Sequence, residues 1–116
     1  MKQYNIWFSL TLIIALIPIS VKAERWNGEK ISQMIGAMSW CTNNAAKNPS
    51  EASIYQSARR AGTIALKKAI DNGDIDSNES LEILKKSETE GKYFDQTLNP
   101  ERCKQIWQSV NENPIF

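Results

Sequence analysis

Residues 31–45 read ISQMIGAMSWCTNNA, and the spacing of their apolar side chains decides the fold class. Apolar or small residues recur at intervals of three and four, which is the period of one face of an α-helix. The stripe consists of Ile31, Met34, Ile35, Met38, Thr42 and Ala45, with Cys41 beside it. The pattern predicts a first helix from about Glu29 to Ala46.

A second helix is predicted from Pro49 to about Ile70. Asn48 suits the capping position, and Glu51 stands three residues after it, as in a capping box. Small side chains dominate the expected inner stripe, so another helix can approach closely. The members of this stripe are Ile54, Ala58, Ala61, Ala65 and Ala69, with Gly62 and Leu66 next to them. Close packing is the simpler explanation for Gly62, and contact with a ligand is the alternative.

The segment DNGDIDSNESLE, residues 71–82, is dense in acidic side chains and invites comparison with a calcium-binding loop. Such loops need oxygen ligands at positions 1, 3, 5, 9 and 12, and a glycine at position 6. With Gly73 at position 6, positions 1 and 3 fall on Lys68 and Ile70, which carry no side-chain oxygen. In the register that starts at Asp74, Lys85 replaces the bidentate acid. We therefore expect no metal site here.

The same segment is explained as a turn between two helices. Asn72 and Gly73 are suited to end the second helix, and Asp76 is suited to cap a third helix over residues 77–90. The residues expected to face inward from this helix are Leu81 and Leu84. The triplet that starts at Asn78 also matches the N-glycosylation sequon, which would matter only in a eukaryotic secretory pathway.

A fourth helix is predicted to begin with Asn99 as its cap and Pro100 at its first position. Its inward stripe is Cys103, Ile106, Trp107 and Val110. No alternating run of apolar and polar residues predicts a β-strand in residues 24–116. The expected fold class is therefore all-α, a small four-helix bundle held by one disulfide.

The first 23 residues have the layout of a secretory signal peptide. Lys2 gives a positive start, residues 6–21 are apolar apart from three hydroxyl side chains, and Val21, Lys22 and Ala23 offer a cleavage site. The apolar run is shorter than the ~20 residues that a membrane-spanning helix needs. We expect cleavage after Ala23, which leaves residues 24–116 as a single helical domain in the periplasm or outside the cell. An uncleaved N-terminal anchor is the alternative.

Removal of the signal peptide also sets the charge of the mature protein. Lys2 and Lys22 leave with it, so the 14 basic residues become 12 against 13 acidic ones, a net charge of −1. Nucleic-acid binding needs a clustered basic excess, and binding to a membrane surface needs a polybasic patch. We expect neither kind of partner.

Both cysteines, Cys41 and Cys103, lie in the predicted mature part, on or beside inward stripes. An even pair in an exported chain is typical of a disulfide, whereas redox-active pairs usually stand close together in sequence. The bond would join the first helix to the fourth. It would close a loop of about 62 residues and stabilise the fold by roughly 4 kcal/mol in the chain-entropy model.

The sequence lacks the residues that most enzymes use. It contains no histidine, and a disulfide would leave no thiolate. The commonest general base and every Ser-His or Cys-His nucleophile are therefore missing. No phosphate-binding or dinucleotide fingerprint occurs. We expect no enzyme and no cofactor.

Four residues are candidates for a surface that binds a partner: Trp26, Trp40, Arg59 and Arg60. On a helical wheel Trp40 points away from the main stripe of the first helix. It is either covered by the chain ends, such as Trp26 or the tail at Ile115 and Phe116, or exposed as an anchor for a partner, because tryptophan is enriched among binding hot spots. A solvated helix face is the simpler interpretation of the arginine pair. Trp107, by contrast, should be core.

Three non-enzymatic functions remain open. The first, which we expect, is a protein-binding module of the cell envelope, of the inhibitor or immunity type, with another protein as its partner. The second is a periplasmic stress chaperone, since the chain resembles the acid-stress chaperones of the HdeA type in its size, its cysteine count and the Ser39-Trp40 pair before Cys41. The third is an accessory domain of an envelope assembly.

Overall fold

The computed structural model describes residues 26–113 and residue 115. In this part the chain forms four helices and one short hairpin. They are α2 (Gly28–Asn44), α3 (Pro49–Asp71), α4 (Ser77–Glu90), β1 (Lys92–Tyr93), β2 (Gln96–Thr97) and α5 (Pro100–Glu112). The predicted signal peptide, residues 1–23, lies outside the described residues. The mostly helical fold and the positions of all four predicted helices are confirmed.

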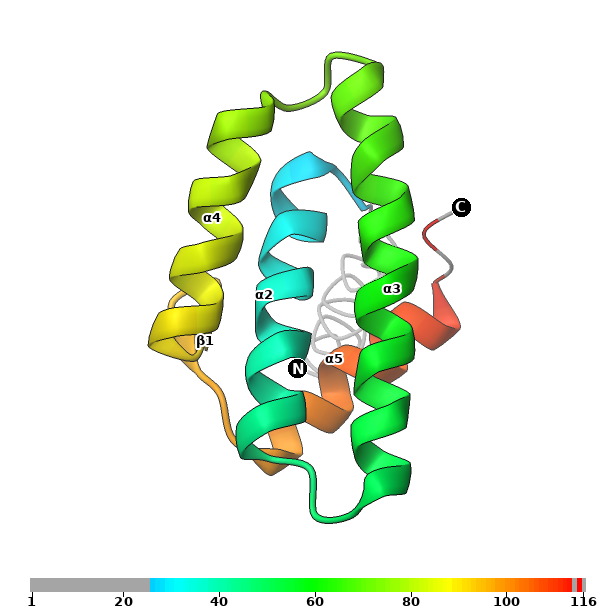
Figure 1. Ribbon diagram of the computed structural model, residues 1–116, viewed down its shortest axis with the longest axis vertical. Helices are drawn as coiled ribbons and strands as arrows, with labels where there is room; N and C mark the ends of the chain where they lie inside the picture. Colours follow the sequence, from blue (N-terminus) through cyan, green and yellow to red (C-terminus); the bar gives the residue numbers. More distant parts are fainter. Residues whose placement is uncertain (1–25, 114, 116) are drawn as a thin grey trace, which may run out of the picture.

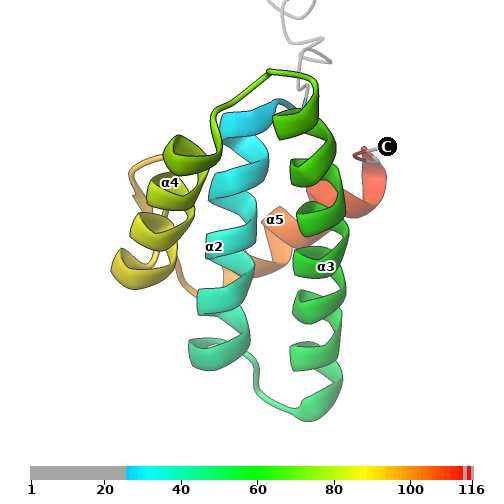
Figure 2. The same cartoon turned by 45° about the horizontal axis from the view of Figure 1, so that its top comes forward.

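α2 is the central helix. It lies between α3 and α4, and α5 crosses obliquely behind α2 and α3 (Figure 1). Figure 2 shows the same order from a second direction. Because α2 has neighbours on three sides, ten of its 17 residues are buried. The predicted stripe, which ends at Ala45 just after α2, is buried except for the half-buried Thr42.

The helix starts are fixed by the caps that the sequence predicts. The side chain of Asn48 accepts a hydrogen bond from the backbone of Glu51, and Asn99 does the same for Arg102. Asp76 accepts from the first turn of α4. A side-chain cap is worth about 1 kcal/mol, because it pairs a backbone N–H that the helix itself leaves free.

A glycine at each contact lets α2 approach its two neighbours closely, Gly62 at the contact with α3 and Gly36 at the contact with α4. A Cβ atom at Gly62 of α3 would lie 2.5 Å from Met34 Cε and 2.8 Å from Ile35 Cγ1. A Cβ atom at Gly36 of α2 would collide with the backbone oxygen of Leu84 in α4. Close packing against α2 therefore accounts for Gly62, as the simpler of its two interpretations predicts.

Two predicted inward residues are in fact exposed. Ile54 of α3 is 36 % exposed, and Tyr55 takes its place at 2 %. The buried face of α3 consists of Tyr55, Ala58, Gly62, Ala65, Leu66 and Ala69. At its N-terminal end the buried residue is therefore one position later than the predicted stripe has it. Leu81 of α4 is 49 % exposed, and Leu84 is only partly buried.

α4 packs on α2 through serines rather than leucines. Ser80 and Ser87 are its buried residues, and the Ser87 hydroxyl lies 2.5 Å from the backbone oxygen of Lys92 and 3.0 Å from that of Gln33 in α2. The Ser39 hydroxyl of α2 donates to the Glu88 carboxylate at 2.7 Å. The close α2–α4 contact is therefore made by small hydrogen-bonded side chains, and this leaves Leu81 outside.

The hairpin contradicts the prediction that residues 24–116 contain no strand. Its register pairs Lys92 with Thr97 and Tyr93 with Gln96. The two turn residues, Phe94 and Asp95, both have positive φ, as the favoured two-residue hairpin turns require. A ladder of two residues on each side is too short to leave an alternating pattern in the sequence.

The disulfide is confirmed. Cys41 of α2 and Cys103 of α5 are bonded, with their Cα atoms 5.9 Å apart, and both are fully buried. α5 buries only Cys103 and Ile106 completely, so the disulfide is a large part of what holds this helix against α2.

The acidic turn between α3 and α4 also has a structural role. Gly73 adopts φ 78° and ends α3. The carboxylate of Asp74 accepts a hydrogen bond from the backbone N–H of Gly28 at 2.7 Å, which caps the start of α2 from outside the helix. The turn therefore ties three helices together.

Candidate binding surfaces

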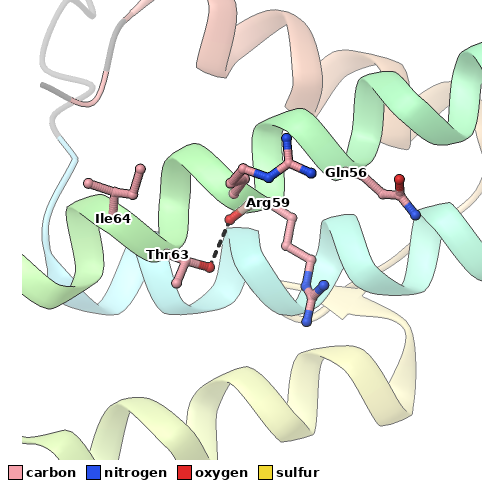
Figure 3. Close-up of a pocket in the computed structure, with 5 residues that line it drawn as sticks. Gln56, Arg59, Thr63 and Ile64 are labelled. Atoms are coloured by element: carbon pink, nitrogen blue, oxygen red, sulfur yellow. Dashed lines mark hydrogen bonds between the residues drawn. The ribbon is translucent and has the colours of Figure 1, made fainter.

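The first candidate surface is the α3 outer face, which we define as Gln56, Arg59, Arg60, Thr63 and Ile64. These five residues line one open hollow, and all of them are exposed. Figure 3 shows the labelled side chains projecting from α3, with the Thr63 hydroxyl donating to the backbone oxygen of Arg59 at 3.0 Å. Ile64, at 52 % exposure, places an apolar side chain among them.

The charge along α3, on and beside this face, has one sign. Residues 52–70 carry four cations and no anion, and all four cations are exposed: Arg59, Arg60, Lys67 and Lys68. Lys67 pairs with Asp71 one turn later, at 3.3 Å. Within the described part of the chain the guanidinium groups of Arg59 and Arg60 form no hydrogen bond or ion pair. The two arginines are therefore available to an outside anion or carboxylate.

Acidic side chains gather on the next segment instead. Residues 71–82 carry five carboxylates and no cation, and all five are exposed. The molecule thus has a basic outer face on α3 and an acidic end at the α3–α4 turn, although its net charge is small. Separated charges of this kind orient a charged partner as it approaches, even though the net charge of the molecule is small.

The second candidate surface is the groove between α3 and α5, where Trp107 stands between two hollows. The smaller hollow has a volume of about 120 Å³ and is lined by Glu51, Ile54, Tyr55, Lys104, Trp107 and Gln108. The larger hollow is lined by Ser57, Ala58, Ala61, Trp107, Val110, Asn111 and Ile115. Trp107 is only partly buried, so it is a wall of this groove and not the core residue that the sequence predicts.

Tyr55 is a titratable residue whose pKa is clearly shifted by its surroundings. Burial raises the pKa of its hydroxyl above the ordinary value of 10.0, and the negative charge of Glu51 raises it further. The phenol is therefore held neutral over a wider range of pH than an exposed tyrosine would be.

Trp40 is covered on one side by the end of α4. It is half-buried, and its indole packs under Gly91, where a Cβ atom would lie 2.7 Å from the indole nitrogen. Gly91 ends α4 with φ 66°, so the residue that terminates α4 also makes room for Trp40. The described residue that packs on Trp40 is therefore Gly91 of the α4–β1 turn, whereas Trp26, one of the covers that the sequence suggested, lies elsewhere.

Trp26 lies elsewhere, against the end of α5. Its indole N–H donates to the backbone oxygen of Asn113 at 2.6 Å, and the ammonium group of Lys30 lies 4.6 Å from the centre of its ring. The structure thus does not bring the four candidate residues together. The arginines share the α3 outer face, while Trp26 and Trp40 belong to two other regions.

Sequence reasoning missed the groove between α3 and α5. The available signal was the pair Ile54-Tyr55 on α3 facing Trp107 on α5, but the phase of α3 had to be known to within one residue to recognise it.

No group of three or more histidine, cysteine or acidic side chains in residues 26–113 is arranged to hold a metal ion. No helix in the same part has the length and apolar character needed to cross a membrane.

Comparison with known proteins gives no match to a family model, to a curated protein or to a solved structure.

Proposed function

We propose that this protein is an exported, disulfide-held helical module that binds another protein of the cell envelope, as an inhibitor or an immunity-type neutraliser. The binding surface is the α3 outer face, and the observation that carries the proposal is the unpaired arginine pair Arg59-Arg60 beside the exposed Ile64. Arginine is enriched among interface hot spots, because its guanidinium group forms bidentate bonds to carboxylates and its stem packs against apolar groups.

The charge of the face indicates the chemistry of the partner. Four exposed cations without an anion over residues 52–70 favour a partner surface that presents carboxylates around an apolar position for Ile64. Complementary charge raises the association rate and excludes basic partners. The disulfide between α2 and α5 supports the assignment to an oxidising compartment, which is where envelope and secreted proteins function.

The test is a charge reversal with a matched control. Arg59→Glu/Arg60→Glu reverses the arginine pair, and Lys85→Glu/Lys86→Glu reverses an equally exposed adjacent pair on α4 by the same total charge. A photo-reactive amino acid at Thr63 captures the partner in intact cells, and affinity is then measured with the purified partner at several salt concentrations. We expect the arginine variant to lose at least 30-fold in affinity, as for a hot-spot contact of 2 kcal/mol or more.

Two results would contradict the proposal. One is an equal loss of affinity in the arginine and lysine variants, which would show a dependence on overall charge and not on the α3 outer face. The other is a cross-linking pattern at Thr63 that Arg59→Glu/Arg60→Glu leaves unchanged. Circular dichroism of each variant checks that the fold is intact.

A stress chaperone is the second candidate function. It is favoured by the scatter of exposed large apolar side chains over three elements: Ile54 and Ile64 on α3, Leu81 on α4 and Phe94 in the hairpin. Chaperones that bind many clients need apolar surface in several places, whereas a specific binder gathers it. Suppression of client aggregation at acidic pH by the wild type, lost in Leu81→Gln/Phe94→Gln, would favour this function over the first.

A further inference from the structure

The smaller hollow between α3 and α5 is separate from the α3 outer face and has the properties of a ligand pocket. Its wall is apolar where Ile54, Tyr55 and Trp107 meet, and its volume is about 120 Å³. For comparison, an engineered apolar cavity of about 150 Å³ in another protein binds benzene. The hollow between α3 and α5 is of similar size and opens to solvent, so its enclosed part matches a single six-membered ring.

One polar group on the wall is left without a partner. Tyr55 is 2 % exposed, and its hydroxyl makes no hydrogen bond within residues 26–113. The one side-chain nitrogen or oxygen in that part that is both enclosed and unpaired is Nε of Arg102, so the Tyr55 hydroxyl is reachable from outside. Because Tyr55 lines the pocket, its hydroxyl can pair with a polar atom of an occupant.

The rim of the pocket favours a small molecule over the side chain of a docking protein. Lys104 and Gln108 are exposed at the mouth, and the Glu51 carboxylate accepts a hydrogen bond from the backbone N–H of Lys47 at 2.9 Å. The centres of protein interfaces are depleted of lysine and glutamate, because a covering partner would strip their water. A single ring that enters the pocket leaves both charges hydrated.

We propose that the pocket between α3 and α5 binds a small molecule with one aromatic ring and a polar substituent, of the phenol class. The ring lies against Ile54 and Trp107, and the substituent forms a hydrogen bond with the Tyr55 hydroxyl. Such an arrangement, an apolar cleft with one or two placed polar groups, is the usual form of a small-molecule site.

The experiment titrates the ¹⁵N-labelled protein with phenol and, separately, with toluene. Trp107→Phe assigns the indole signal of Trp107, and the indoles of Trp26 and Trp40 serve as internal controls because both lie outside the pocket. We expect a saturable shift of the Trp107 signal with a dissociation constant on the order of 1 mM, and no shift of the other two. Absence of a saturable shift would overturn the proposal.

Variants then locate the ring and its substituent. Tyr55→Phe should weaken phenol binding roughly three- to tenfold, because the loss of one hydrogen bond lowers affinity by about that factor. It should leave toluene binding unchanged. Ile54→Trp should fill the pocket and abolish binding of both ligands. Ile64→Trp is its matched control, because Ile64 lines the other hollow of α3 and not this pocket, and it should leave binding intact.

Equal weakening of phenol and toluene by Tyr55→Phe would overturn the hydrogen bond, and full binding by Ile54→Trp would overturn the location. Arg59→Glu/Arg60→Glu should bind phenol normally. The pocket can therefore be confirmed even if the α3 outer face proves to bind nothing.

Discussion

Removal of the disulfide should destabilise the protein more than any single change in its core. The double variant Cys41→Ser/Cys103→Ser opens a loop of 62 residues without leaving a free thiol. In the chain-entropy model, closing a loop of this length restricts the unfolded chain by about 4 kcal/mol. A domain of this size loses about 4–8 °C in melting temperature per kcal/mol. The expected fall is therefore on the order of 15–30 °C.

The structure also predicts where the loss begins. Among the residues of α5 only Cys103 and Ile106 are fully buried, while Trp107 and Val110 are partly covered. α2, α3 and α4 are joined by far more extensive contacts and by the caps around the acidic turn. In the double variant α5 should therefore detach before the other three helices unfold.

Differential scanning calorimetry measures the first effect, and amide hydrogen exchange measures the second. We expect exchange in residues 100–112 to become fast under conditions where α2 remains protected. A fall of less than 5 °C together with unchanged protection of α5 would instead show that packing alone holds this helix. Chemical reduction of the wild type provides an independent control, because it breaks the bond without changing either side chain's size.

Three further predictions follow from single contacts. Gly36→Ala should cost about 1–3 kcal/mol in thermal or urea unfolding, because its Cβ atom meets the backbone of α4; a neutral result would show that α2 and α4 can separate freely. Asp74→Ala should cost about 1 kcal/mol through loss of the bond to Gly28, and millimolar calcium should not raise the melting temperature of the wild type; a rise that this variant abolishes would reveal an ion site. Since the pKa of Tyr55 is raised in the folded state, the unfolded chain loses its proton first, and stability should fall as pH rises above about 10. Tyr55→Phe should reduce this alkaline loss, as followed by urea midpoints; equal losses in the wild type and the variant would contradict the shift.

The sequence was sufficient for those features whose signals are local. Asn48, Asp76 and Asn99 each cap a helix as their spacing predicts, because a cap depends only on residues two or three positions away. The pairing of Cys41 with Cys103 was also predictable, since the chain has no other cysteine. Each of these predictions needed no knowledge of how the helices pack.

The features that the sequence did not predict depend on contacts between helices. Leu81 is exposed while Ser80 and Ser87 are the buried residues of α4, with Ser87 at the close approach to Gly36, and a pattern of apolar residues does not predict that a serine is buried. Tyr55 replaces Ile54 in the core because it lies on the face of α3 that the other helices cover. The pocket is lined by residues of both α3 and α5, so no pattern within a single helix could have revealed it.

The pocket and the disulfide are linked through α5. Lys104 and Trp107 line the pocket on the same helix as Cys103, one and four residues after it, and α5 has little other buried surface to hold it against α3. A molecule that binds only when α5 is in place adds its binding free energy to the stability of that arrangement. The disulfide in turn lowers the cost of keeping the pocket formed, because the unfolded chain has less freedom to lose. Formation of the disulfide therefore favours the arrangement in which Tyr55 of α3 and Trp107 of α5 line one pocket.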